Sequence, residues 1–125
     1  MNWAAAGGIA MALAVATGAF GAHGLQKRLD PAAIGWWQTA AQYHVYHALG
    51  LFAVAWAGSV GAGGRALAVS GWAMLAGIVL FSGSLYVMAL TGLRWLGAVT
   101  PLGGTAWIVA WIALAVATWG RPVAS

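Results

Sequence analysis

The sequence contains no cysteine, and Asp30 is its one acidic side chain in 125 residues. Without cysteine the chain has no disulfide, no thiolate nucleophile, and no cysteine ligand for zinc or an iron–sulfur cluster. Charged residues make up 5% of the sequence, whereas a soluble domain carries about 25%. Because so few charges cannot cover a water-facing surface, we expect most of the surface to face lipid, as in an integral membrane protein.

Long apolar runs occupy most of the sequence. Hydrophobic residues make up 63% of it, and a helix needs about 20 apolar residues to cross a hydrocarbon core of about 30 Å. Four runs reach that length, at about residues 3–22, 34–56, 66–90 and 101–119. They lack the alternation of barrel strands, and backbone in lipid must satisfy its own hydrogen bonds. The sequence therefore predicts one all-α domain over residues 1–125, an integral membrane bundle of four transmembrane helices.

The positive charges lie singly or in pairs between the apolar runs, at Lys27, Arg28, Arg65, Arg94 and Arg121. A nucleic-acid site would gather its cations on one face, so we expect no nucleic-acid partner despite the net charge of +4. Cations near span ends instead mark the inner side of a membrane. No cation precedes the first run, which favours a retained helix over a cleaved signal peptide. Since the loops after the first and third runs carry more cations, the sequence predicts both termini outside.

Two proline-containing pairs are typical of helix starts. In Asp30-Pro31 and Thr100-Pro101, a side chain that can cap a helix precedes a proline at the first helical position. Capping explains Asp30 fully, so we do not expect it to be catalytic.

Small residues recur at helical spacing in the first and third runs. Gly18, Gly21 and Gly77 lie on stripes of this kind. Small residues let two spans approach closely, which is how helices associate in lipid. We expect these glycines to pack against neighbouring helices.

The second apolar run has an unusually polar first half. At 100° per residue, Thr39, Tyr43 and His47 fall on one half of the helix, and His44 points elsewhere. Ser82 and Tyr86, four residues apart, form a second polar line in the third run. Because polar faces in hydrocarbon turn toward other helices or a wet cavity, we expect these five side chains to form a buried cluster around His47.

The residues exclude several kinds of chemistry. Zinc needs three or four His, Cys or acidic ligands, and a Ser-His-Asp triad needs an acid within the bilayer. His44 and His47 lie on one helix and cannot clamp a single haem, whereas His23 with His47 could do so if their helices packed suitably. An interhelical hydrogen bond is the simpler role for His47. We therefore expect no catalytic, metal-binding or cofactor-binding residue.

Four ordered motifs carry a family resemblance: Gly-Ala-Phe-Gly-Ala-His-Gly at 18–24, Trp-Gln-Thr-Ala at 37–40 with Tyr43 and His47, Phe-Ser-Gly-Ser-Leu-Tyr at 81–86, and Thr-Pro-Leu-Gly-Gly at 100–104. With these motifs the chain closely resembles the small membrane proteins called domain of unknown function 423, which include eukaryotic transmembrane protein 256. The resemblance covers nearly the whole chain. It implies a four-span protein of the bacterial cytoplasmic membrane, without an established enzymatic activity, substrate or cofactor.

These observations favour a non-enzymatic structural or accessory component of the membrane. Its expected partners are the lipid bilayer and either further copies of itself or another membrane protein. The alternative is a small transporter or channel, assembled as an oligomer because four helices leave little room for a pore. A third class, haem or quinone binding, depends on His23 and His47 together with the tryptophans.

Overall fold

The computed structural model describes residues 1–121, and over that range every regular element is helical. Helix α1 (Trp3–Phe20) continues into a π-helical turn (Gly21–Leu25). Helix α2 (Pro31–Ser59) is one unbroken helix of 29 residues. Helix α3 (Gly64–Gly77) passes through a π-helical segment (Ile78–Gly83) into α4 (Ser84–Thr91), and a 3₁₀ segment (Arg94–Ala98) leads into α5 (Thr100–Thr118).

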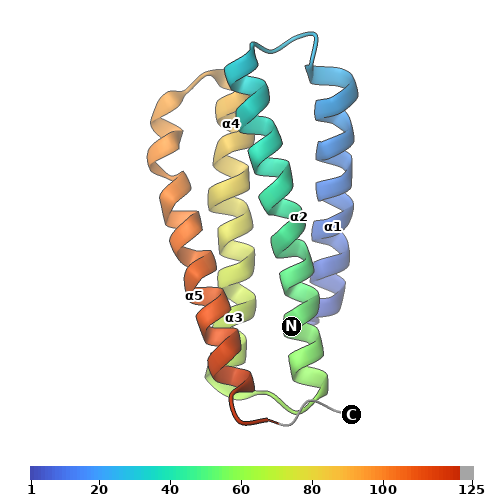
Figure 1. The fold of residues 1–125 in the computed structure, drawn as a ribbon, viewed down its shortest axis with the longest axis vertical. Helices are drawn as coiled ribbons and strands as arrows, with labels where there is room; N and C mark the ends of the chain where they lie inside the picture. Colours follow the sequence, from blue (N-terminus) through green and yellow to red (C-terminus); the bar gives the residue numbers. More distant parts are fainter. Residues whose placement is uncertain (122–125) are drawn as a thin grey trace.

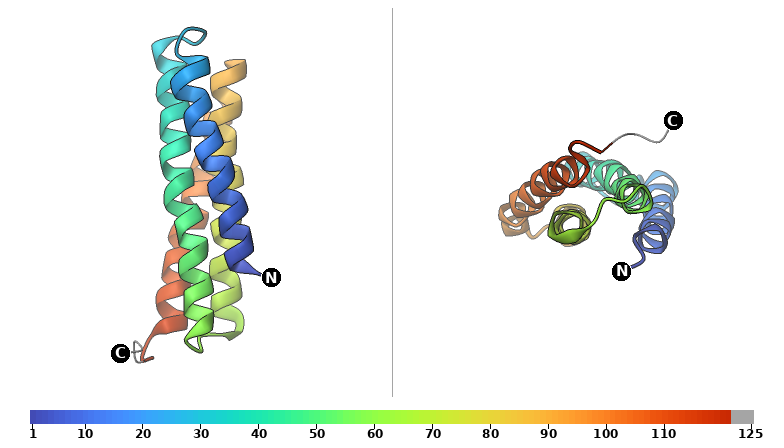
Figure 2. Two further views of the ribbon diagram at one scale, coloured as in Figure 1. Left: turned by 90° about the vertical axis from the view of Figure 1, so that its right-hand side faces the viewer. Right: turned by 90° about the horizontal axis from the view of Figure 1, so that it is seen from below.

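These elements form four long antiparallel rods (Figure 1). We call them the α1 rod (Trp3–Leu25), α2, the α3–α4 rod (Gly64–Thr91) and the α5 rod (Arg94–Thr118). The α1 rod packs along α2, and α5 packs along the α3–α4 rod. Figure 2 shows α2 in the middle of the arrangement, where it contacts each of the other rods.

Local signals in the sequence begin and end these helices. The Asn2 side chain caps α1 by accepting from the Ala5 amide at 3.0 Å. The Asp30 carboxylate accepts from the Ala33 amide at 2.8 Å, ahead of a proline in the first turn of α2. Helix α4 stops at Gly92, whose φ of 73° lies in the left-handed region that glycine tolerates. Asp30 and Pro31 thus lie at a helix start, as their spacing indicates.

The core of the bundle consists of small and medium apolar side chains, with Leu51, Val54 and Met74 fully buried. The outer surface is also apolar: Ile9, Val79 and Ile108 are each more than 60% exposed. A water-soluble protein does not expose aliphatic side chains in this number over its whole length. The exterior is therefore suited to lipid rather than water.

Three of the four rods are long and apolar enough to cross a membrane, namely Trp3–Leu25, Gly64–Thr91 and Arg94–Thr118. Helix α2 does not meet that standard because its first half is polar. The expected bundle of four helices is present in the described residues, but composition and length identify three spans rather than four. The first three rods extend a few residues beyond the expected bounds, whereas the fourth runs from Arg94 to Thr118 rather than over 101–119.

The loops and charges divide between the two ends of the bundle. The loop after the α1 rod holds Lys27 and Arg28, and Arg94 begins the α5 rod at the same end (Figure 1). The Arg94 guanidinium lies 5.6 Å from the centre of the Trp36 ring, within range for a cation–π contact. Arg65 and Arg121 lie at the opposite end, where α1 begins and α5 ends.

Candidate functional site

The bundle interior contains two polar clusters on different sides of α2. The first, which we call the Tyr86 network, joins three rods. The Tyr86 hydroxyl lies 2.9 Å from Thr17 Oγ1 of α1 and 3.0 Å from His44 Nδ1 of α2. The Trp37 indole N–H donates to the Thr17 carbonyl at 2.8 Å, and the Trp37 ring lies 4.6 Å from the Tyr86 ring. The network therefore ties α1, α2 and α4 together.

The second cluster, which we call the His47 stack, lies between α2 and α5. The His47 ring is parallel to the Trp107 indole, with 3.6 Å between ring centres and 3° between planes. His47 Nδ1 lies 2.7 Å from the Tyr43 carbonyl oxygen. Because a carbonyl oxygen only accepts, Nδ1 carries the proton. Trp107 donates its indole N–H to the Met74 carbonyl at 3.2 Å, so α2, α3 and α5 meet at this stack.

The structure does not gather the five residues of the expected His47 cluster in one place. Tyr86 belongs to the Tyr86 network and bonds to His44 rather than to His47. Ser82 is fully buried and donates to the Ala40 carbonyl at 2.8 Å. Tyr43 contacts His47 through its backbone, while its own side chain is 40% exposed. Thr39 is half-buried.

Sequence reasoning missed His44, which is buried at 4% exposure and central to the Tyr86 network. Helical periodicity correctly sets His44 apart from the face of His47. Its partner Tyr86, however, lies 42 residues away and bonds in turn to Thr17 on a third helix. A local pattern does not reveal such partners.

Two of the three glycines expected to pack against other helices do so. A Cβ at Gly21 would overlap the Trp37 indole, and a Cβ at Gly77 would overlap the Trp107 indole. Gly18 has open space where a Cβ would be. The structure adds Gly71, which lies under the Trp3 ring, and Gly103, which lies against the Phe81 backbone.

The expected helix start at Thr100-Pro101 has a different geometry. Helix α5 begins at Thr100 itself, and Val99 occupies the capping position without a side-chain bond. The Thr100 hydroxyl instead lies 2.6 Å from Ser84 Oγ and donates to the Leu96 carbonyl at 3.3 Å. The 3₁₀ segment before Thr100 already supplies a helical turn, so the Thr100 side chain is not needed as a cap. It instead links two rods through its bond to Ser84.

The structure offers limited means of holding a ligand. Among residues 1–121, no group of three or more His, Cys, Asp or Glu side chains comes together as a metal site. His23 is exposed near the end of the α1 rod, whereas His47 is buried in its aromatic stack. In the described part of the chain, Nε2 of His44 is a buried side-chain atom without a hydrogen bond of good geometry, although the Ala10 backbone lies beside the ring.

Comparison with known proteins shows which family and which relatives this sequence is similar to. Residues 17–104 match the profile of a family described as "Protein of unknown function (DUF423)". A "UPF0382 membrane protein" of Bacillus subtilis is 51% identical over 111 residues, covering 89% of this chain and 90% of the relative. A Staphylococcus saprophyticus protein of the same designation is 45% identical over 108 residues, covering 85% and 87%. No solved structure matches.

Proposed function

The chain belongs to this family of membrane proteins, as its motifs indicated, and we propose that it is a non-enzymatic structural or accessory component of the bacterial cytoplasmic membrane. One observation carries the proposal: most polar side chains between its helices bond one rod to another. Such bonds hold spans together, at about 1 kcal/mol or less each. Because these groups are already bonded to one another, no bound ligand is needed to explain why they are buried.

These bonds reach every rod. Trp37 joins α2 to α1, and Tyr86 joins α4 to both. Other hydrogen bonds between rods join Ser82 to the Ala40 carbonyl at 2.8 Å, Ser70 to the Ala110 carbonyl at 2.8 Å, and Ser84 to Thr100 at 2.6 Å. Side chains from all four rods thus take part in bonds between rods.

The proposal includes α2 as a fourth span. At 1.5 Å per residue its 29 residues extend about 43 Å, and it lies in the middle of three rods that are themselves long enough to cross. Because the chain has no cysteine, single-cysteine variants test this directly. Lys27→Cys and Gly63→Cys lie at the two ends of α2, and a membrane-impermeant maleimide applied to intact cells should label only one. Labelling of both from outside would contradict the fourth span.

The same experiment tests the proposed orientation. Lys27, Arg28 and Arg94 lie at one end against Arg65 and Arg121 at the other, and cation excess favours the first end inside. The cysteine at position 63 should therefore react in intact cells, and the cysteine at position 27 only after permeabilisation. The reverse result would invert the topology.

The proposed structural role can be tested by complementation of a deletion strain. In a deletion strain, dye entry across the cytoplasmic membrane should rise, and rescue should follow the amount of folded protein rather than any single chemical group. His47→Leu and Tyr86→Phe are the informative variants, with Gly18→Ala as the control in open space. A variant that accumulates folded at the wild-type level yet fails to rescue would contradict the proposal, as would unchanged dye entry in the deletion strain.

A second candidate is a small oligomeric transporter or channel, and one observation favours it. Gln38, Gln42 and Tyr46 are exposed along α2, and the Gln42 amide donates to the Tyr46 hydroxyl at 2.6 Å. Exposed polar groups within a span turn toward other protein or water. Self-association through this stripe should be weakened by Gln42→Leu, as measured by crosslinking in native membranes. Solute flux in vesicles containing the purified chain, lost in that variant, would favour the transporter over the structural role.

A further inference from the structure

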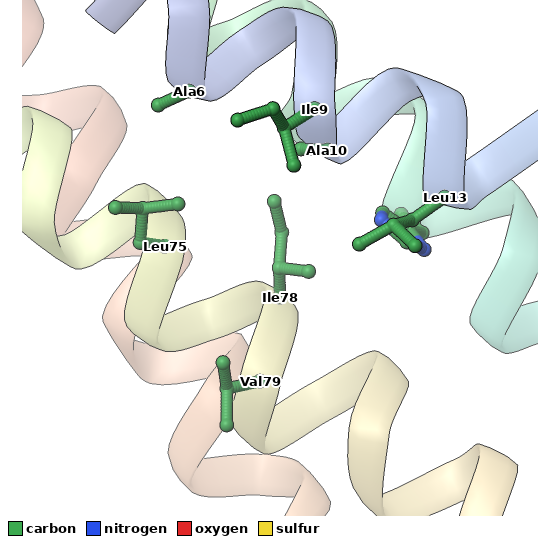
Figure 3. Close-up of a pocket in the computed structure, with 8 residues that line it drawn as sticks. Ala6, Ile9, Ala10, Leu13, Leu75, Ile78 and Val79 are labelled. Carbon is green, nitrogen blue, oxygen red and sulfur yellow. The ribbon is translucent and has the colours of Figure 1, made fainter. Parts of the chain in front are cut away.

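The outer face of α2 is polar over part of its length, unlike the groove of about 330 Å³ between α1 and the α3–α4 rod. Figure 3 shows Ile9 and Leu13 across that groove from Val79, and all three side chains are more than half exposed. Lipid chains are as apolar as these side chains, so this surface needs no protein partner. On α2, by contrast, Gln42 and Tyr46 are exposed. That part of the α2 face is poorly matched to lipid.

Given the fourth span proposed above, Gln42 and Tyr46 lie well inside the hydrocarbon layer. Trp36 and Trp56 are 20 positions apart on α2, or about 30 Å, which is the thickness of that layer. Gln42 lies about 9 Å and Tyr46 about 15 Å from the level of Trp36. Exposed polar groups at this depth turn toward other protein or water.

Gln42 and Tyr46 keep hydrogen-bonding capacity for a partner. Among residues 1–121 the two side chains bond only to each other, at 2.6 Å. The amide carries both N–H donors and a carbonyl acceptor, and the hydroxyl donates as well as accepts. Their one bond leaves donors and acceptors of both kinds unused, whichever way the amide is turned. The pair is therefore complementary to a second pair of the same kind.

The face around this pair has the seven-residue repeat of two parallel helices in contact. Its members, spaced alternately by three and four residues, are Gly35, Gln38, Gln42, Val45, Leu49, Phe52 and Trp56, and none of them is buried. In parallel helix pairs with this repeat, the first position of each heptad faces its own counterpart, and a single polar residue there fixes the register. Gln42 occupies such a position.

Gly35 is a separate indication of a neighbour on this face. A Cβ at Gly35 would meet no atom of the described chain within 4 Å. Glycine weakens a helix relative to alanine, and no contact within the chain explains its presence here. A missing side chain at this position lets another helix approach the α2 backbone closely.

A second copy of the chain fits this face. Copies insert into the membrane in one orientation, so a two-fold axis along the membrane normal brings identical residues together at the same depth. Like charges at such an axis would repel, and α2 contains no Asp, Glu, Lys or Arg. We propose that the chain forms a parallel two-fold dimer through α2, in which the Gln42–Tyr46 pair of one copy bonds to the same pair of the other.

The remaining residues of the face favour a closed dimer over a pore. Beyond Tyr46 the exposed side chains of the repeat are Leu49, Phe52 and Trp56. A continuous aqueous lumen would have polar groups along its whole length, whereas a contact between two helices accommodates a polar part and an apolar part. The dimer therefore covers the polar face and leaves no channel along it.

Cysteine crosslinking in native membranes tests the contact, because the chain has no cysteine of its own. Leu49→Cys places a thiol at a position that faces its counterpart and leaves Gln42 and Tyr46 intact. Oxidation with copper phenanthroline should then link two full-length chains. Ile108→Cys is the matched control, since Ile108 is 62% exposed on α5 and the stack of His47 on Trp107 places it at nearly the same depth. The control should form far less of the linked dimer.

The second measurement is the dimer Kd in lipid vesicles, from energy transfer between labelled copies of the purified chain at decreasing protein-to-lipid ratio. Gln42→Leu should raise this Kd about three- to tenfold, as expected for the loss of interhelical hydrogen bonds. Gln42→Asn keeps an amide and should recover part of the affinity. Since Gln42 is exposed, the circular dichroism of both variants should match that of the wild type.

Three results would each refute the dimer. They are a Leu49→Cys chain that crosslinks no more than Ile108→Cys, a Leu49→Cys chain that crosslinks only to a different protein, and an unchanged Kd in Gln42→Leu. The dimer rests on the proposed fourth span, and maleimide labelling at positions 27 and 63 reads that span separately. Labelling of one end without the crosslink would refute the dimer alone, whereas labelling of both ends from outside would refute the span and the dimer together.

Discussion

Replacement of Gly77 by alanine tests the packing that holds the His47 stack in place. A Cβ at this position would overlap the Trp107 indole. The indole has little freedom to retreat, because it is stacked 3.6 Å from His47 and donates to the Met74 carbonyl at 3.2 Å. Trp107 is also buried, at 4% exposure. The added methyl group must therefore separate α3 from α5 or break one of these two contacts.

The loss of stability caused by Gly77→Ala can be estimated from these contacts. Overpacking a well-filled interior costs about 1–3 kcal/mol, and loss of the Trp107 hydrogen bond would add about 1 kcal/mol. Alanine has a better helix propensity than glycine by about 1 kcal/mol, which offsets part of this loss. We expect Gly77→Ala to destabilise the bundle by about 1–3 kcal/mol.

Gly18→Ala is the matched control. Gly18 is also helical, but a Cβ there meets no atom within 4 Å. The control should be neutral or slightly stabilising. Unfolding of both variants in mixed micelles with increasing sodium dodecyl sulfate measures the difference, and near-ultraviolet circular dichroism reports on the Trp107 environment. Equal stability of the two variants would refute the argument that the Gly77–Trp107 contact fixes the distance between α3 and α5.

Three further substitutions can be measured by the same titration. Ser82→Ala removes the buried bond to the Ala40 carbonyl and should cost about 1 kcal/mol; a wild-type midpoint would mean that the bond contributes nothing. Asp30→Ala should lose about 1 kcal/mol of capping, while Asp30→Asn should keep most of it, and equal losses would argue against capping. Gly103→Ala places a Cβ against the backbone of the α3–α4 rod, whereas Gly104→Ala makes an ordinary contact at 3.9 Å; the first should cost about 1–3 kcal/mol more, and equal effects would exclude a close approach there.

The sequence predicted only part of the candidate site. The polar first half of α2 identified the correct region, and its periodicity correctly separated His44 from His47. The sequence suggested a single cluster because Tyr43, His47, Ser82 and Tyr86 are all polar within apolar runs. The rotation of each helix about its own axis determines which of these side chains meet. That rotation depends on contacts such as Gly21 against Trp37 and Gly77 against Trp107, which join residues distant in the chain.

The sequence by itself determined that the chain is helical, that its surroundings are apolar, and that it belongs to its family. These properties follow from composition and from runs along the chain, since the length of an apolar run and the scarcity of charge do not depend on how helices pack. The tertiary structure alone decided that the Tyr86 hydroxyl bonds to both His44 and Thr17, and that His47 stacks on Trp107. Hydrogen-bond partners on three separate helices are set by the distances between rods, and those distances arise from side-chain packing.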